Sequence, residues 1–155
     1  MAKKLAIIAS KGTLDWAYPP FILASTAAAL GYEVYIFFTF YGLALLKKDL
    51  SDVKISPLGN PAMPMPIPMP NLMQVLPGVE TLATAMMQKK LKDKGVASLD
   101  SLRSLSLDAG VKMVACQMTV DLFDFKAEEF IDGITFGGAA TFFQFAGEAD
   151  ISLFI

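Results

Sequence analysis

LAIIASKGTLDWAYPPFILASTAAALGYEVYIFF, residues 5–38, decides the fold of this chain. Leu5–Ala9 is a short apolar run typical of a buried strand, and Glu33–Phe38 is a second run rich in β-branched and aromatic residues. The alanine-rich stretch between them predicts a helix from about Trp16 to Leu30, with Pro19 and Pro20 confined to its first turn. A strand, a helix and a strand in this order predict a right-handed βαβ unit with parallel strands.

The rest of the chain continues the alternation of strands and helices without an internal repeat. Helices are expected over about 78–94 and 98–110, at 119–123, and from 138 to about 146. Further strands are expected at Val111–Ala115, Gly133–Phe136 and Ile151–Ile155. The pattern predicts one α/β domain over residues 1–155 with a mainly parallel sheet, in which the strands at 5–9, 33–38 and 111–115 are neighbours.

The chain is unusually apolar, with 54% hydrophobic residues and a mean hydropathy of +0.50. Two explanations fit: a membrane segment, or strands buried on both faces of a parallel sheet. The longest apolar stretch, Phe21–Leu46, is interrupted at 31–33, and each half is shorter than the roughly 20 residues of a spanning helix. We therefore expect no stable membrane insertion.

A proline- and methionine-rich arm occupies about residues 57–77 and contains seven of the nine prolines. Such a segment cannot form a helix or a central strand, so an extended conformation is expected. A simple linker is one interpretation. The alternative is docking against another subunit in a homo-oligomer, because the arm carries apolar side chains at Met63, Met65, Ile67 and Met69.

Charge and residue usage exclude several classes of function. The 155 residues contain no histidine, which rules out a Ser-His-Asp triad, a Cys-His pair and histidine metal sites. The carboxylates show no spacing typical of a metal site, so no metal is expected. A net charge of −2, without a basic block, argues against nucleic acid as a partner. A single cysteine cannot form an intrachain disulfide, which fits a reducing compartment.

Cys116 is the candidate nucleophile. It lies where the expected strand Val111–Ala115 gives way to a helix, and α/β sheets place reactive groups at the carboxyl ends of their strands. The N–H groups of a following helix would stabilise a thiolate there, whereas Asp121 and Asp124 would oppose one. The alternative is a small buried hydrophobic residue, which is the common role of an unpaired cysteine.

The turn after the first expected strand is a second candidate. Ser10, Lys11, Gly12 and Asp15 could orient a ligand in a pocket shared with Cys116, because both segments follow parallel strands. A phosphate at the start of the next helix is a second possibility, although neither GxGxxG nor GxxxxGK[ST] is present. The third is an ordinary capped helix start.

Two blocks, KKLAIIASKGTLDWAYPPFILASTAAALGYEVYIFFTFYGLALL and VKMVACQMTVDLF, together with the arm between them, resemble the DsrE/DsrF-like sulfur-trafficking family. The resemblance implies a doubly wound, flavodoxin-like α/β fold with helices on both faces, and homo- or hetero-oligomers. It also implies a cytoplasmic carrier in which Cys116 accepts sulfane sulfur as a persulfide. The partners would be sulfur donor and acceptor proteins of rhodanese-like or TusA-like type, and no cofactor is needed.

The sequence departs from some relatives because it lacks a second cysteine, so sulfur cannot be relayed within one subunit. A rhodanese-type CxxGxR loop and a peroxidatic TxxC pattern are also missing. The rival hypothesis is a non-catalytic oligomeric or small-ligand-binding protein, with nucleotides among the candidate ligands. In that case Cys116 would be inert and buried.

Overall fold

The computed structural model describes residues 1–56 and 76–155, so nearly all of the expected arm at 57–77 lies outside the described residues. The described strands form one five-stranded sheet in the order β4-β3-β2-β1-β5. Every pair of neighbouring strands in it is parallel, which confirms the predicted sheet and its three central neighbours. The strands are β1 (Lys4–Ala9), β2 (Glu33–Phe38), β3 (Lys112–Cys116), β4 (Thr135–Gly137) and β5 (Ile151–Phe154).

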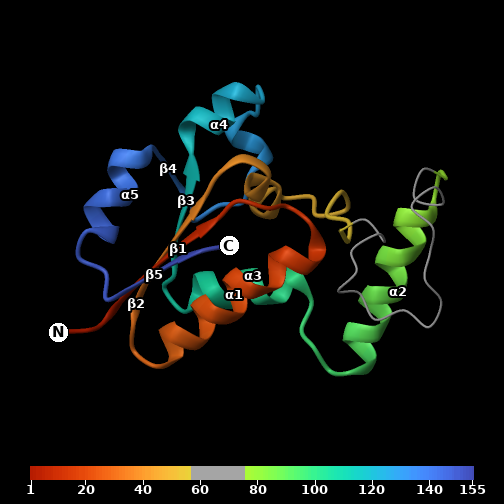
Figure 1. Ribbon diagram of the computed structural model, residues 1–155, viewed down its shortest axis with the longest axis horizontal. Helices are drawn as coiled ribbons and strands as arrows, with labels where there is room; N and C mark the ends of the chain where they lie inside the picture. The colour runs from red at the N-terminus through yellow and green to blue at the C-terminus, as the bar shows by residue number, and fades with distance from the viewer. Residues whose placement is uncertain (57–75) are drawn as a thin grey trace.

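Helices cover both faces of this sheet, as Figure 1 shows. α1 (Leu14–Ala29) and α3 (Leu99–Asp108) pack side by side on one face, and α5 (Ala139–Ala146) lies on the other. α2 (Val79–Asp93) stands apart from these layers, and α4 (Gln117–Leu122) rises beyond the end of β3. Two short 3-10 helices, η1 (Phe40–Leu46) and η3 (Ala127–Glu129), follow β2 and α4. The doubly wound α/β prediction is confirmed.

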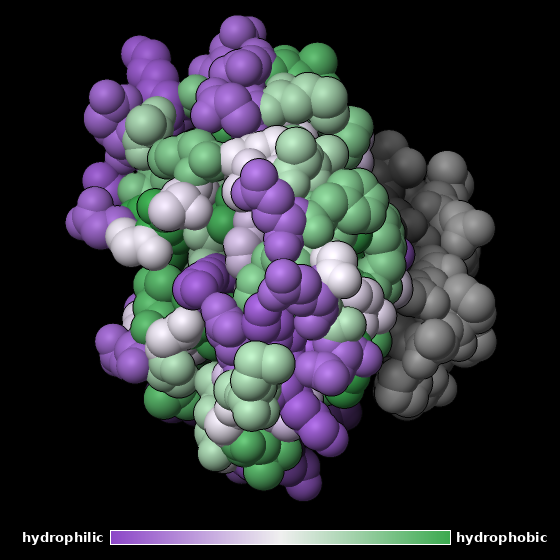
Figure 2. All heavy atoms as spheres, turned by 90° about the vertical axis from the view of Figure 1, so that its left-hand side faces the viewer, coloured by the Kyte–Doolittle hydropathy of each residue, from purple (hydrophilic) through white to green (hydrophobic). Residues whose placement is uncertain are grey.

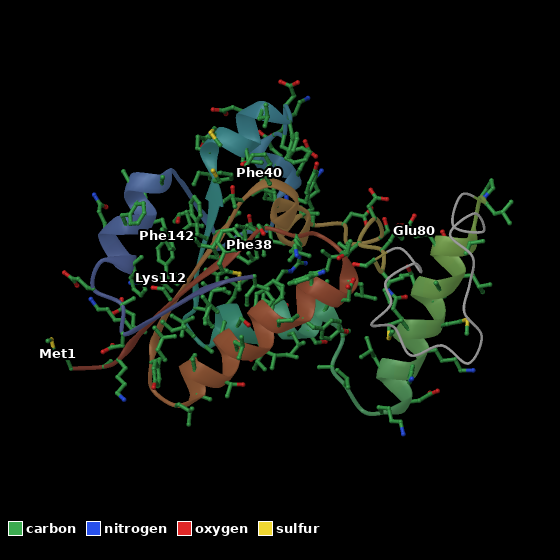
Figure 3. All side chains as sticks on the ribbon, viewed as in Figure 1. Met1, Phe38, Phe40, Glu80, Lys112 and Phe142 are labelled. Carbon is green, nitrogen blue, oxygen red and sulfur yellow. The ribbon has the colours of Figure 1, made fainter. Side chains whose placement is uncertain are left out.

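The strands bury side chains on both faces, which accounts for much of the high apolar content. The face toward α1 and α3 carries alternate residues such as Ile7, Ile36 and Met113. The opposite face carries Ala6, Tyr35, Phe37, Val114 and Cys116, which pack with Phe142 of α5. Figure 3 shows Phe142 on the α5 side of the sheet. None of the helices in residues 1–56 and 76–155 is long and apolar enough to cross a membrane.

The start of α1 differs from the prediction. The helix begins at Leu14, two residues before the expected start, so Pro19 and Pro20 lie in its second turn. Neither ring can donate a hydrogen bond to the carbonyl four residues earlier. The helix continues because its apolar side packs in the core, where Ala17, Pro20 and Phe21 are buried. Tertiary packing therefore outweighs the local effect of the prolines.

The α5 side of the molecule keeps apolar side chains at its surface. Figure 2 shows hydrophobic groups there among hydrophilic ones. Phe143 of α5 is 68% exposed and Phe154 of β5 is 74% exposed. Large aromatic side chains exposed to this degree are typical of contact surfaces.

Candidate functional site

The candidate site lies at the carboxyl edge of the sheet. Cys116 is the last residue of β3 and the N-cap of α4, so the predicted strand-to-helix junction is confirmed. Its side chain is only 5% exposed and lies on the α5 side of the sheet. Because α4 begins directly after Cys116, the free backbone N–H groups of its first turn point toward this end of β3, and the Cys116 side chain does not cap them with a hydrogen bond.

The surroundings of the thiol favour its ionised form. Burial is the largest single influence and raises the pKa of Cys116. The hydroxyls of Thr119 and Thr39 and the N–H groups of Thr119 and Met118 act in the opposite direction, because these polar groups favour the thiolate. Together they outweigh burial, so the pKa of Cys116 is lower than that of an ordinary cysteine. A lowered pKa increases the thiolate fraction near neutral pH.

A pair of threonines holds this environment in place. The hydroxyl oxygens of Thr39, directly after β2, and Thr119 of α4 are 3.3 Å apart, and Thr119 is fully buried. The N–H of Phe40 donates to the Thr119 hydroxyl oxygen over 3.2 Å. Because that oxygen accepts from Phe40, the Thr119 hydroxyl hydrogen is free to point at Thr39 or at the sulfur of Cys116.

The backbone that supplies the Phe40 N–H is strained. Phe40 has a φ of 47°, in the left-handed region that bulky residues rarely adopt. Such strain costs on the order of 1–3 kcal/mol and clusters at functional sites. Figure 3 shows Phe40 below α4, at the same edge of the sheet as the start of that helix. The strained residue therefore links the end of β2 to the surroundings of the thiol.

Replacing Thr119 by valine is expected to slow the reaction of Cys116 with iodoacetamide at pH 7 by roughly tenfold, since a hydrogen bond to a charged group contributes about 1.5 kcal/mol. The loss of the hydroxyl raises the pKa of Cys116, so a smaller fraction is thiolate and the rate profile shifts to higher pH. The alkylation rate measured against pH checks this. Thr119→Ser keeps the hydroxyl and should stay close to the parent; equal losses in both variants would attribute the effect to packing.

The β1–α1 turn is bound to other parts of the chain. The N–H and hydroxyl of Ser10 both donate to the carbonyl of Ile155, over 2.8 and 3.1 Å. A carboxylate oxygen of Asp15 accepts from the N–H of Ser56 at 2.9 Å, and the N–H of Leu14 donates to the Lys54 carbonyl at 2.7 Å. Ser10 and Asp15 therefore fix the local structure. A helix start occupied by protein groups and a carboxylate is unfavourable for a phosphate.

Lys11 and Gly12, the other two candidates, line a cavity of about 460 Å³ between this turn, η1 and residues 123–125. The ammonium nitrogen of Lys11 lies 3.3 Å from the ring centre of Trp16. Cys116 is not among the described residues that line the cavity. The turn and the cysteine thus meet the same edge of the sheet, as expected, but the structure does not bring them into one pocket.

Sequence reasoning missed Thr39, Phe40 and Thr119. One signal was available: Thr119 follows Cys116 by three residues at an expected helix start, the spacing at which a side chain and a backbone N–H share a first turn. Thr39 carries no such signal, because only the register of β2 against β3 brings it near Cys116; Phe38 pairs with Ala115. The strain at Phe40 leaves no mark in the sequence.

Comparisons with known proteins identify the family of the chain. A protein of Allochromatium vinosum named sulfur carrier protein DsrE2 is 65% identical over 157 residues, covering 99% of this chain and 98% of that protein. The protein YrkE of Bacillus subtilis is 32% identical, covering 99% of this chain and 97% of its own length. The structure of the YchN protein from E. coli has the same fold, with a TM-score of 0.57 at 12% identity over 99% of both chains. Residues 1–154 match the DsrE/DsrF/DrsH-like family, and the chain therefore belongs to it.

Proposed function

We propose that this protein is a cytoplasmic sulfur carrier that holds sulfane sulfur as a persulfide on Cys116. The observation that carries the proposal is the position of a lone thiol, Cys116, at the end of β3 and the start of α4. The nearby polar groups of Thr119, Thr39 and Met118 lower its pKa, in agreement with this role. The name of the relative from Allochromatium vinosum, sulfur carrier protein DsrE2, supports the same role. Intact-mass measurement of sulfur uptake tests it.

The transfer consists of two exchange steps. The Cys116 thiolate attacks the outer sulfur of a donor persulfide, the bond between the two donor sulfurs breaks, and the donor leaves as a thiolate. With a thiosulfonate donor, the leaving group is a sulfinate. The resulting persulfide on Cys116 is then attacked at its outer sulfur by an acceptor thiolate, which regenerates the Cys116 thiolate. No step requires a metal or an organic cofactor.

The burial of Cys116 suits a carrier better than a freely reacting enzyme. A persulfide is easily lost to solution thiols and oxidants, and access governs the rate of such exchange. With 5% of its surface exposed, the residue is shielded by its neighbours. Donor and acceptor proteins, for which rhodanese-like and TusA-like proteins are the candidates, would have to displace part of this cover. We propose that release depends on such docking.

The rival function is a non-catalytic binding protein with an inert cysteine, and the same low exposure favours it. Alkylation discriminates the two. A carrier thiol should react in the folded protein near pH 7, whereas an inert buried thiol reacts only after unfolding. Because Cys116 is the only cysteine in the chain, every adduct reports on this residue.

We further propose that the protein is a homo-oligomer. The exposed rings of Phe143 and Phe154 on the α5 side supply a surface suited to a subunit contact. Light scattering at micromolar concentration should therefore give a mass that is a multiple of the 16.7 kDa chain. A single species at the mass of one chain, stable across a tenfold dilution series, would contradict this.

A further inference from the structure

The cavity beside the β1–α1 turn has aromatic walls from three separate segments of the chain. Its volume of about 460 Å³ lies within the range of small-molecule sites. The rings are also in contact with one another: Tyr41 stacks on Phe123 with centroids 6.1 Å apart, and Phe123 meets Phe125 at 5.6 Å. The aromatic wall consists of Trp16, Phe40, Tyr41, Phe123 and Phe125.

The walls are locked together by backbone packing. A Cβ atom on Gly12 would lie 2.2 Å from the carbonyl oxygen of Tyr41, and one on Gly42 would lie 2.1 Å from that of Ala9. Only glycine permits so close an approach between the β1–α1 turn and η1. The hydroxyls of Thr13 and Ser56, 3.1 Å apart, join the turn to the segment after η1. The cavity is thus formed before any ligand arrives, which reduces the cost of binding.

Part of its aromatic surface is exposed. Tyr41 is 70% exposed, and Phe40 and Trp16 are also exposed. Phe40 lines the cavity in the strained conformation described above. Exposed aromatic rings gathered in one preformed hollow are typical of a binding site.

The charge at the cavity is positive. Lys11 is the only charged side chain among the described residues that line it. The nearest carboxylate in the turn, Asp15, is hydrogen bonded to the N–H of Ser56 and is not part of the lining. The Lys11 ammonium rests on the face of Trp16, where a lysine can move on its flexible stem to meet an anion.

We propose that this cavity binds a small organic anion: a molecule with an aromatic or aliphatic body and one acidic group. The body would lie against the aromatic wall, and the acidic group would pair with Lys11. The site is separate from Cys116 and does not depend on sulfur transfer, so it can be tested whether or not the thiol carries sulfur.

Trp16 provides the measurement, because it is the only tryptophan in the chain and lies in the cavity wall. 4-Phenylbutyrate and 4-phenylbutan-1-ol have the same body and differ in charge, and both leave tryptophan excitation clear. Titration of the full chain with each, followed by Trp16 emission, should give saturable changes, with the acid binding about fivefold more tightly than the alcohol, as expected for an exposed ion pair. Equal affinity, or no saturable change with the acid, would overturn the proposal.

Variants of Lys11 distinguish the contribution of its charge to binding from that of the aromatic wall. Lys11→Met keeps the stem but removes the ammonium, and should bring the ratio between acid and alcohol to about one; Lys11→Arg should retain it. Lys3 is exposed and lies at the opposite end of β1, so Lys3→Met is the matched control and should leave both affinities unchanged. A preference for the acid that survives in Lys11→Met would show that another site binds it.

Discussion

Cys116→Ser is expected to abolish sulfur loading. Incubation of the parent protein with polysulfide, followed by intact-mass spectrometry, should show a gain of about 32 Da per sulfur atom, removed by dithiothreitol. The serine variant should show no gain, because a hydroxyl at neutral pH is not ionised and cannot attack a sulfane sulfur. The substitution is small and Cys116 lies at a strand end, so the fold should persist, which circular dichroism can check.

The donor series extends this experiment. Thiosulfate and a persulfidated donor protein should be tried beside polysulfide, because the burial of Cys116 can make loading depend on the donor. Thr119→Val should load more slowly than Thr119→Ser if thiolate formation limits the reaction. A folded parent protein that gains no sulfur from any of the three donors would favour the non-catalytic binding function.

Gly42→Ala is expected to destabilise the protein by about 3 kcal/mol, toward the upper end for overpacking. The added methyl would meet the carbonyl oxygen of Ala9 at 2.1 Å and its carbon at 2.8 Å, and these are backbone atoms of β1 that cannot move aside. η1 would have to shift as a unit and carry Phe40 with it. Urea unfolding followed by circular dichroism measures the free energy of unfolding.

The matched control is Gly138→Ala. Gly138 precedes α5 with a φ of −105°, and a Cβ there meets no atom within 4 Å. This variant should retain the parent free energy of unfolding to within about 0.5 kcal/mol. If both alanine variants were equally stable, the close packing of η1 on β1 would not be what holds the cavity walls together.

Local pattern was sufficient to predict most of the sheet. β2 has the predicted bounds, and β1 and β3 differ from theirs by one residue, because a buried parallel strand is a continuous apolar run. The predicted start of α1 was wrong because the helix tolerates Pro20 in its second turn only through burial of that residue in the core, which is a tertiary effect. The position of Cys116 at the strand end could be predicted because the apolar strand pattern ends there and a helical pattern begins.

The site itself was less predictable. Lys11 and Gly12 line a cavity, whereas Ser10 and Asp15 bond to Ile155 and Ser56, contacts of large sequence separation that no turn motif encodes. The aromatic wall also comes from segments about 80 residues apart, with Tyr41 stacked on Phe123. Residues near in space but distant in the chain leave no periodic signal, so such a site emerges only from the fold.

The position of β5 has a consequence for synthesis of the chain. β1 is an interior strand of the finished sheet, yet one of its two neighbours is formed by residues 151–154, with Leu5 paired to Ile151. While the nascent chain is still shorter than this, one side of β1 has unpaired N–H and C=O groups next to apolar side chains, an arrangement that favours pairing with other chains. The sheet therefore remains incomplete until β5 has left the ribosome, and before that point the open edge of β1 is a site where the growing chain can associate with other chains.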